Sequence, residues 1–278
     1  MIQPEKRCRN CGQYLLMHQK FCHECGQKTA THRIDFHFLV HEIQHGIFHV
    51  DGGILYTLKE LFTRPGHTLR EYLEGKRQQH FKPLMLVIIL GSVCALIQYY
   101  LKPAAEPDRS GTFTTKISSA DASKYIDFQG FISYFKQIFD WLGNHFAFTV
   151  LLMIPVAAFG FLLGFRKYRY NYPEWLVILL FLTGQSLAVY VFFIFLNHFA
   201  GIDITWFYLI SWMLITVSLI QFFEFTRKRY IVLRSFWSMF LTYFFSLIYI
   251  VLAIVLLALI GVIRYGYDNL LPTLIETY

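Results

Sequence analysis

Long apolar runs separated by short polar connections occupy most of the chain. Five of these runs are long enough to cross a hydrocarbon core about 30 Å thick, and they lie at about 83–101, 146–165, 175–199, 204–223 and 235–263. Their interiors contain no Asp, Glu, Lys or Arg, which is typical of helices that cross a bilayer. The pattern predicts an all-α integral membrane protein with a five-span transmembrane domain over 83–278 and an external loop over 102–145.

Residues 31–82, before the first run, carry an amphipathic pattern. After Asp35, which suits a helix N-cap, apolar residues recur near the helical period at Phe36, Leu39, Val40, Ile43 and Ile47. The pair Gly52–Gly53 is expected to end this helix, and a second apolar face follows at Ile54, Leu55, Leu58, Leu61 and Phe62. Apolar faces with basic and aromatic rims predict cytoplasmic helices that lie in the headgroup layer.

Composition supports the membrane assignment, and charge orients it. The chain has 278 residues, of which 55% are hydrophobic and 15% are charged, well below the quarter expected of a soluble domain. Of the 25 Lys and Arg, 19 fall on one side if five spans start from a cytoplasmic N-terminus, which leaves the C-terminus external. Because the topology rule and anionic lipids account for the net charge of +7, we expect no nucleic-acid partner.

Two Cys-x-x-Cys pairs, Cys8–Cys11 and Cys22–Cys25, open the chain, and each is followed by a glycine. Four thiols in this arrangement suit one tetrahedral zinc ion with a closed, structural coordination shell. We therefore expect a zinc ribbon over residues 1–30, in a cytoplasm whose reduced thiols favour zinc over disulfides. A redox dithiol and disulfides are the alternatives. Cys94 lies in an apolar run and is expected to be a small buried hydrophobe.

Histidines recur every four residues at His37, His41, His45 and His49, and residues 41–45 read His-Glu-Ile-Gln-His. On a helix this spacing allows a second metal site at His41, His45 and His49, with Glu42 as the candidate general base of a zinc peptidase. The segment 31–82 has no room for the sheet that normally presents a peptide substrate. We favour a polar helix face directed at headgroups and keep the peptidase as an alternative.

Few polar groups interrupt the predicted spans. Among them are Gln98, Thr183, Gln185 and Ser186. Hydrogen bonds between helices explain such groups best, and a transporter of lipid or of a small solute is a further alternative. Tryptophans near the predicted span ends fit an aromatic belt, namely Trp141, Trp175, Trp206 and Trp237.

Short motifs also connect the two Cys-x-x-Cys-Gly turns to the first span. They are Phe21-Cys22, Gly26-Gln27, Arg64-Pro65-Gly66, Arg70-Glu71-Tyr72, Gly75-Lys76-Arg77 and Lys82-Pro83-Leu84. In this order they resemble domain-of-unknown-function family 3667, over about residues 8–100. The resemblance implies a multi-pass protein of the bacterial inner membrane and brings no activity with it. The five-span topology is also similar, in architecture alone, to the Yip family of membrane-trafficking proteins.

The basic motif segment before the first span is a candidate contact surface. Its candidate binding residues are Arg64, Arg70, Tyr72, Lys76 and Arg77, which would hold anionic lipid headgroups or an acidic partner. The simpler interpretation is a basic anchor that fixes the first span. Taken together, the patterns favour a membrane scaffold, adaptor or regulator, rather than an enzyme, whose zinc ribbon recruits a protein partner.

Overall fold

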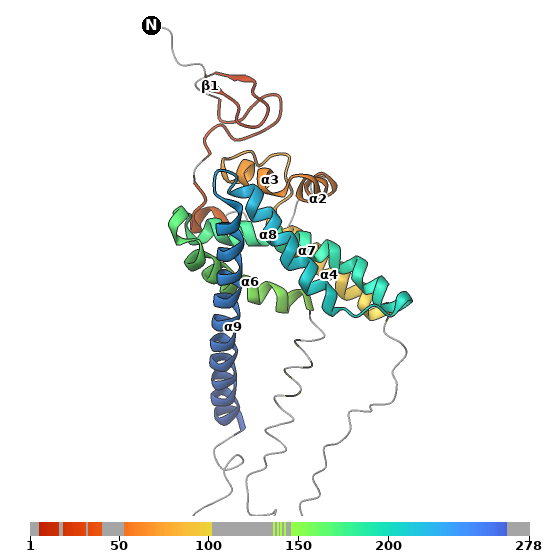
Figure 1. Ribbon diagram of the computed structural model, residues 1–278. Coiled ribbons are helices and arrows are strands. Elements are labelled where there is room, and N and C mark those ends of the chain that lie inside the picture. The colour runs from red at the N-terminus through yellow and green to blue at the C-terminus, as the bar shows by residue number, and fades with distance from the viewer. Residues whose placement is uncertain are drawn as a thin grey trace, which may run out of the picture.

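The computed structural model describes residues 6–16, 19–31, 33–40, 53–101, 136, 138, 140, 142 and 146–265. The described chain is mostly helical, with a small two-stranded sheet at its N-terminal end (Figure 1). The elements are β1 (Lys6–Arg7), β2 (Tyr14–Leu15), α2 (Ile54–Thr63), α3 (Pro65–Leu73), α4 (Pro83–Leu101), α6 (Phe146–Gly164), the 3-10 turn η2 (Arg166–Tyr168), α7 (Tyr172–Ala200), α8 (Thr205–Phe222) and α9 (Lys228–Tyr265).

Four helices of the described chain are long and apolar enough to cross a membrane. They are α4, α7, α8 and the part of α9 over Lys228–Leu257. The second predicted run also forms a helix, α6, but its apolar stretch over Phe148–Gly164 is shorter than those of the other four. The protein is therefore a multi-pass membrane protein, and the fifth span stays a prediction. The predicted external loop lies outside the described residues, except for four isolated positions.

The helices alternate in direction, so that five of their ends gather beside the ribbon. The start of α4 follows the ribbon-bound segment, and the start of α7 follows the end of α6 across one short connection. Three contacts hold these ends. Arg33 of the linker contacts Glu174 at the start of α7 (Nε to Oε1, 2.6 Å), and Arg70 of α3 contacts Glu224 just after α8 (Nη2 to Oε2, 2.8 Å). Arg234 of α9 donates to the Gly164 carbonyl at the end of α6 at 2.7 Å. The basic connections around η2 and before α9 consequently lie at the ribbon end of the molecule.

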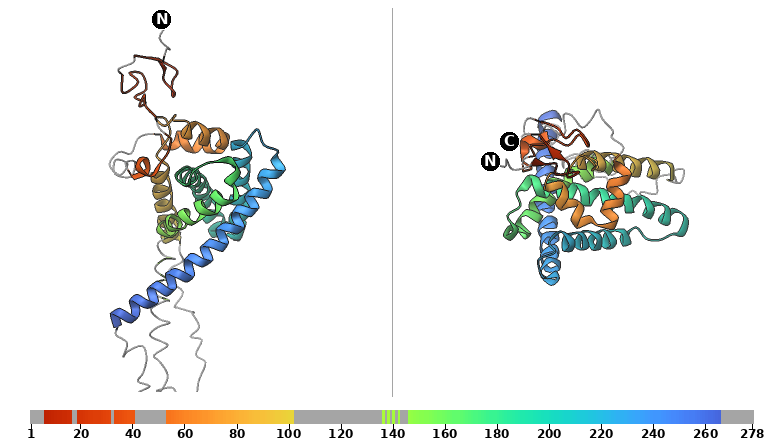
Figure 2. Two further views of the ribbon diagram at one scale, coloured as in Figure 1. Left: turned by 90° about the vertical axis from the view of Figure 1, so that its left-hand side faces the viewer. Right: turned by 90° about the horizontal axis from the view of Figure 1, so that it is seen from above.

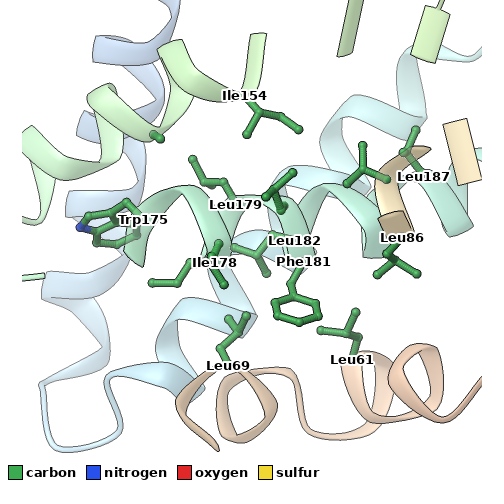
Figure 3. Close-up of a cluster of buried hydrophobic side chains, with 14 of the residues drawn as sticks. Leu61, Leu69, Leu86, Ile154, Trp175, Ile178, Leu179, Phe181, Leu182 and Leu187 are labelled. Atoms are coloured by element: carbon green, nitrogen blue, oxygen red, sulfur yellow. The ribbon is translucent and has the colours of Figure 1, made fainter. Parts of the chain in front are cut away.

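Helix α7 forms the centre of the core (Figure 3). It begins at a capping box in which the Asn171 side chain accepts from the Glu174 N–H and the Glu174 carboxylate accepts from the Asn171 N–H. It ends at Gly201, which takes the left-handed conformation. Side chains of α2, α3, α4 and α6 converge on it, and those labelled in Figure 3 include Leu61, Leu69, Leu86 and Ile154.

Helices α2 and α3 form a hairpin that packs on α7 and α8. The Gln185 side chain of α7 donates to the Leu61 carbonyl at 2.8 Å, and the Tyr72 ring meets Phe181 edge-on at 4.9 Å between centroids. The prediction of a helix here is confirmed, but its buried side differs from the apolar pattern. Thr57 and Glu60 are buried whereas Leu55 and Phe62 are exposed, because the core side of the hairpin supplies hydrogen bonds as well as packing.

Helix α9 crosses the other helices and extends well beyond them (Figure 2). It packs on α6 through small residues, since Cβ atoms added at Gly160 or Gly164 would meet Thr242 or Ser238 of α9. Most of its large apolar side chains are exposed, as expected where lipid replaces protein as the apolar surround. The apolar run predicted at 235–263 therefore forms one helix with the basic segment before it.

Candidate metal centre and its seat on the helices

The two cysteine pairs lie in matching turns of a small ribbon. In each turn the N–H of the first cysteine donates to the carbonyl five residues on, and the glycine N–H donates back to that cysteine, with distances of 2.8 and 2.9 Å in both turns. Gly12 and Gly26 have φ values of 79° and 71°, which side-chain-bearing residues rarely adopt. The glycine after each pair is therefore a requirement of the turn, as the spacing predicts.

The ribbon brings its four thiols to one point. The sulfur atoms of Cys8, Cys11, Cys22 and Cys25 all lie within 4.8 Å of one another. The distances from Cys8 to Cys25 and from Cys11 to Cys22 are both 3.6 Å. Disulfides are excluded because a bonded pair would be about 2.0 Å apart. Sulfurs around a tetrahedral zinc ion, at about 2.3 Å from it, lie about 3.8 Å apart, so the group fits one metal ion.

The thiols of the cluster differ in how readily they ionise. Despite a hydrogen bond from the Gln13 N–H, burial and hydrogen bonds with the neighbouring thiols raise the pKa of Cys11 to about 12. Burial opposes ionisation of Cys25, but hydrogen bonds from the Asn10 side chain and the Gln27 N–H outweigh it and lower the pKa of that thiol to about 7. Metal ligation requires the thiolate. With four protein ligands the shell would be closed, so the site can hold the ribbon together but leaves no position for a substrate.

A buried glutamine attaches the ribbon to the membrane helices. The Oε1 of Gln27 accepts from the N–H groups of Arg77 and Gln78 at 3.1 and 3.0 Å. Both belong to the connection between α3 and α4. Gly75, with a φ of 106°, lies so close to Thr31 that an added Cβ would be 2.7 Å from its hydroxyl. The ribbon is thus seated on the segment that leads into the first span.

Each residue of the candidate binding set has a partner within the protein. Arg64 pairs with Glu60 and, at 3.7 Å, with Glu71; Lys76 pairs with Glu71 at 3.1 Å. Arg70 contacts Glu224 at 2.8 Å and His67 at 2.8 Å. Tyr72 is buried, and Arg77 stacks on Phe38 at 4.2 Å. Arg64, Arg70 and Tyr72 lie on the α2–α3 hairpin, and Lys76 and Arg77 lie in the connection that follows α3. Their binding to lipid or a partner stays a prediction.

Sequence reasoning overlooked Glu174, and it did not show what Gly66 of the Arg64-Pro65-Gly66 motif approaches. Glu174 is buried and receives two N–H groups of Arg33, at 2.6 and 2.7 Å. Gly66 lies so close to α8 that an added Cβ would be 2.3 Å from the Phe222 nitrogen. The order Asn171-Tyr-Pro-Glu174 could have indicated the capping box, but no local signal identifies Arg33 as the distant partner of its glutamate.

The histidine helix is described only at its start. The predicted N-cap is confirmed, because the Phe38 N–H donates to Asp35 Oδ1 at 2.7 Å and residues 36–40 are helical. His41, Glu42, His45 and His49 lie outside the described residues. The second metal site and the peptidase therefore stay predictions that rest on the spacing of these residues.

The described chain combines four cysteines that could hold one metal ion with apolar helices that alternate in direction. These features define a class: a multi-pass membrane protein with an N-terminal candidate metal ribbon. The family model described as "Protein of unknown function (DUF3667)" matches residues 51–94, which confirms the resemblance drawn from the motifs. The match spans the α2–α3 hairpin and α4 as far as Cys94, and the ribbon cysteines lie outside it. No curated protein and no solved structure matches the chain.

Proposed function

We propose that the protein is a scaffold or adaptor of the bacterial inner membrane, in which a zinc-closed cytoplasmic ribbon recruits a protein partner. One observation carries this proposal. The ribbon is fixed to the helices by Gln27, yet it exposes the large side chains of Tyr14, Leu16 and Phe21 to 50, 61 and 55%. Apolar and aromatic groups on a rigid support are typical of a protein-binding surface.

The helices themselves support an anchoring role. Several polar groups of the spans bond to one another: Gln98 donates to the Tyr190 hydroxyl at 2.8 Å, and Ser218 donates to Gln185 at 3.3 Å. Other buried hydroxyls of the described spans have no hydrogen-bond partner there, namely those of Ser186, Ser211, Ser238 and Thr242. The contacts between spans favour helix association over a path for solutes. The exposed Leu55 and Phe62 of α2 give the hairpin an apolar surface that lipid can cover.

Charge supports the orientation in this proposal. The basic residues of the connections lie at the same end as the ribbon, and they are Arg166, Lys167, Arg169, Arg227, Lys228 and Arg229. Bases beside spans stay in the cytoplasm. A cytoplasmic ribbon follows, with reduced thiols that can hold zinc.

The test is partner capture from native membranes with the full-length tagged protein. Phe21→Ser and Leu16→Ser should lose the co-purifying protein while they retain one zinc per chain, whereas Lys20→Ser, an exposed neighbour, should retain both. Cys8→Ser should lose zinc and partner together. Partner binding that survives both Phe21→Ser and Cys8→Ser would contradict the adaptor role.

A further inference from the structure

A cavity of about 500 Å³ lies at the joint between the ribbon and the helices. Three segments form its walls: the end of the ribbon around Gln27 and Lys28, the linker that follows it as far as Phe38, and the segment from Arg77 to Met85 that begins α4. Phe21, one of the exposed side chains of the ribbon, also lines the cavity, whereas Tyr14 and Leu16 do not. Its volume falls within the range of small-ligand sites.

The charge of the lining is positive. Four bases line the cavity, Lys28, Arg33, Arg77 and Lys82, against one acid, Asp35. The carboxylate of Asp35 already accepts the Phe38 N–H as a helix cap. Even with Arg33 balanced by Glu174, the bases of the lining outnumber its acid. Such a lining attracts an anion.

His80 forms part of the buried wall of the cavity. His80 lines the cavity and is only 8% exposed, between the rings of Tyr56 and Tyr72 at 5.5 and 6.2 Å. Within the described chain, its Nδ1 has no hydrogen-bond partner. This nitrogen is shielded from the cavity as well as from solvent, so the positive lining is what indicates an anionic ligand.

The position of the cavity indicates what kind of anion it takes. Lys82 directly precedes the first candidate span, Pro83–Leu101, and Met85 lies in its first turn, so we expect a membrane crossed by this helix to have its headgroups at the level of the cavity. The side chains of Phe38, Phe81 and Met85 give the cavity an apolar wall. Bases beside such a wall match a phosphate that is attached to a glycerol and acyl chains. We propose that this cavity binds a phosphate group, and that its source is the headgroup of an anionic phospholipid.

Lipid retention by the purified full-length protein tests the proposal, with phosphatidylglycerol and phosphatidylcholine as probes. Native mass spectrometry should detect phosphatidylglycerol retained on the wild type and little phosphatidylcholine. Lys28→Gln should lower the apparent affinity for phosphatidylglycerol about five-fold, the effect of one base near a lipid surface. Lys59→Gln removes an exposed base of α2 outside the cavity and should leave the affinity unchanged. Equal losses in both variants would overturn the site.

A second variant distinguishes the effect of the cavity's charge from the effect of its free volume. Ala30→Trp fills the cavity from its rim without changing charge, and it should lower phosphatidylglycerol retention to the level of phosphatidylcholine. Zinc content and the unfolding temperature verify that each variant is folded, and they do so independently of any partner of the ribbon. Retention unchanged in both Ala30→Trp and Lys28→Gln would contradict the proposal.

Soluble phosphate compounds identify the source of the group. Glycerol 3-phosphate and inorganic phosphate at millimolar concentration should compete only weakly with phosphatidylglycerol, because they lack the acyl chains that contact the apolar wall. Binding of glycerol 3-phosphate without binding of phosphatidylglycerol would support the phosphate site but assign it to a soluble ligand. If the protein binds neither glycerol 3-phosphate nor phosphatidylglycerol, both the phosphate site and its assignment to a phospholipid are wrong.

Discussion

At the scale of single residues, the motifs before the first span act chiefly as joints between elements. Pro65 occupies the first turn of α3, where its missing N–H costs nothing. Gly66 follows and allows α3 to touch the backbone of α8. Arg70 then reaches the end of the same helix at Glu224. The motif Arg64-Pro65-Gly66 is visible in the sequence, but only the fold shows what the glycine approaches.

Substitution of Gly66 tests this close contact. A Cβ at Gly66 would lie 2.3 Å from the Phe222 nitrogen, and backbone cannot yield as a flexible side chain can. Gly66→Ala should therefore destabilise the protein by about 1–3 kcal/mol, the usual cost of overpacking. The measurement is the unfolding temperature of the full-length protein in detergent.

Gly201→Ala is the matched control for this substitution. Its added methyl would meet no atom within 4 Å, so it carries only the cost of a left-handed residue, about 1 kcal/mol. Gly66→Ala is expected to melt at a lower temperature than Gly201→Ala. Equal melting temperatures would show that α3 and α8 do not depend on this contact.

The Arg70–Glu224 pair should give the protein a distinct response to acid. Its hydrogen bond lowers the pKa of Glu224 below the ordinary value of 4.5. A carboxyl whose folded pKa is lowered stabilises the fold above its unfolded pKa, and this contribution disappears as the pH falls through the folded pKa. The unfolding temperature of the wild type should therefore decrease more between pH 7 and pH 4 than that of Glu224→Gln.

A matched carboxyl separates this effect from general acid sensitivity. Glu74 is exposed and, among the described residues, forms no salt bridge, so Glu74→Gln should keep the acid response of the wild type. An identical response in Glu224→Gln and Glu74→Gln would show that the pair contributes no pH-dependent stability.

At the scale of elements, periodicity predicted the helices better than it predicted their buried faces. Residues 54–63 form the expected helix, yet the buried Thr57 accepts from the Phe81 N–H at 2.7 Å. This hydrogen bond lies on the side of α2 that faces the core. Local patterns assume that apolar residues face the core, but beside lipid an apolar face can point outward. The ribbon was easier to predict, because four cysteines and two glycines define it within one short segment.

Metal removal should affect the ribbon and leave the helices intact. The buried core of the ribbon consists of Cys8, Leu15 and Cys22, apart from the main core, so bound metal must supply much of its folding free energy. A chelator or Cys8→Ser should make residues 6–31 sensitive to protease, with little change in helical circular dichroism. The measurement is limited proteolysis with mass spectrometry.

Cys94→Ala is the control for the chelation experiment. Cys94 is buried in α4 and its thiol lies 3.6 Å from the Leu187 carbonyl, far from the ribbon in the sequence. This variant should bind one metal ion per chain and resist protease like the wild type. A chelator that lowers the unfolding temperature of the helices as much as it exposes the ribbon would contradict the separation of the two units.

At the scale of the whole molecule, the apolar runs predicted where helices occur, and tertiary contacts decided how they are arranged. Trp175 lies near a helix end as the aromatic-belt pattern predicts, but it is fully buried against Phe161 and Phe165. A sequence pattern does not tell whether such a ring contacts lipid or the apolar side chains of other helices. The number of spans depends on the same distinction, because α6 contacts α4, α7 and α9.

The location of the C-terminal tail tests the fifth span. The ends of α6 and α8 and the starts of α4, α7 and α9 all lie beside the ribbon. If α6 also crosses the membrane, the chain crosses it five times, and the C-terminal tail lies on the side opposite the ribbon. A phosphatase reporter fused after residue 278 should therefore be active, since that enzyme matures only outside the cytoplasm, and a fluorescent protein at the same position should be dark. Fusions in the connection at 166–171 should behave in the opposite way. An active phosphatase there, with an inactive one at the tail, would show that α6 does not cross and that the protein has four spans.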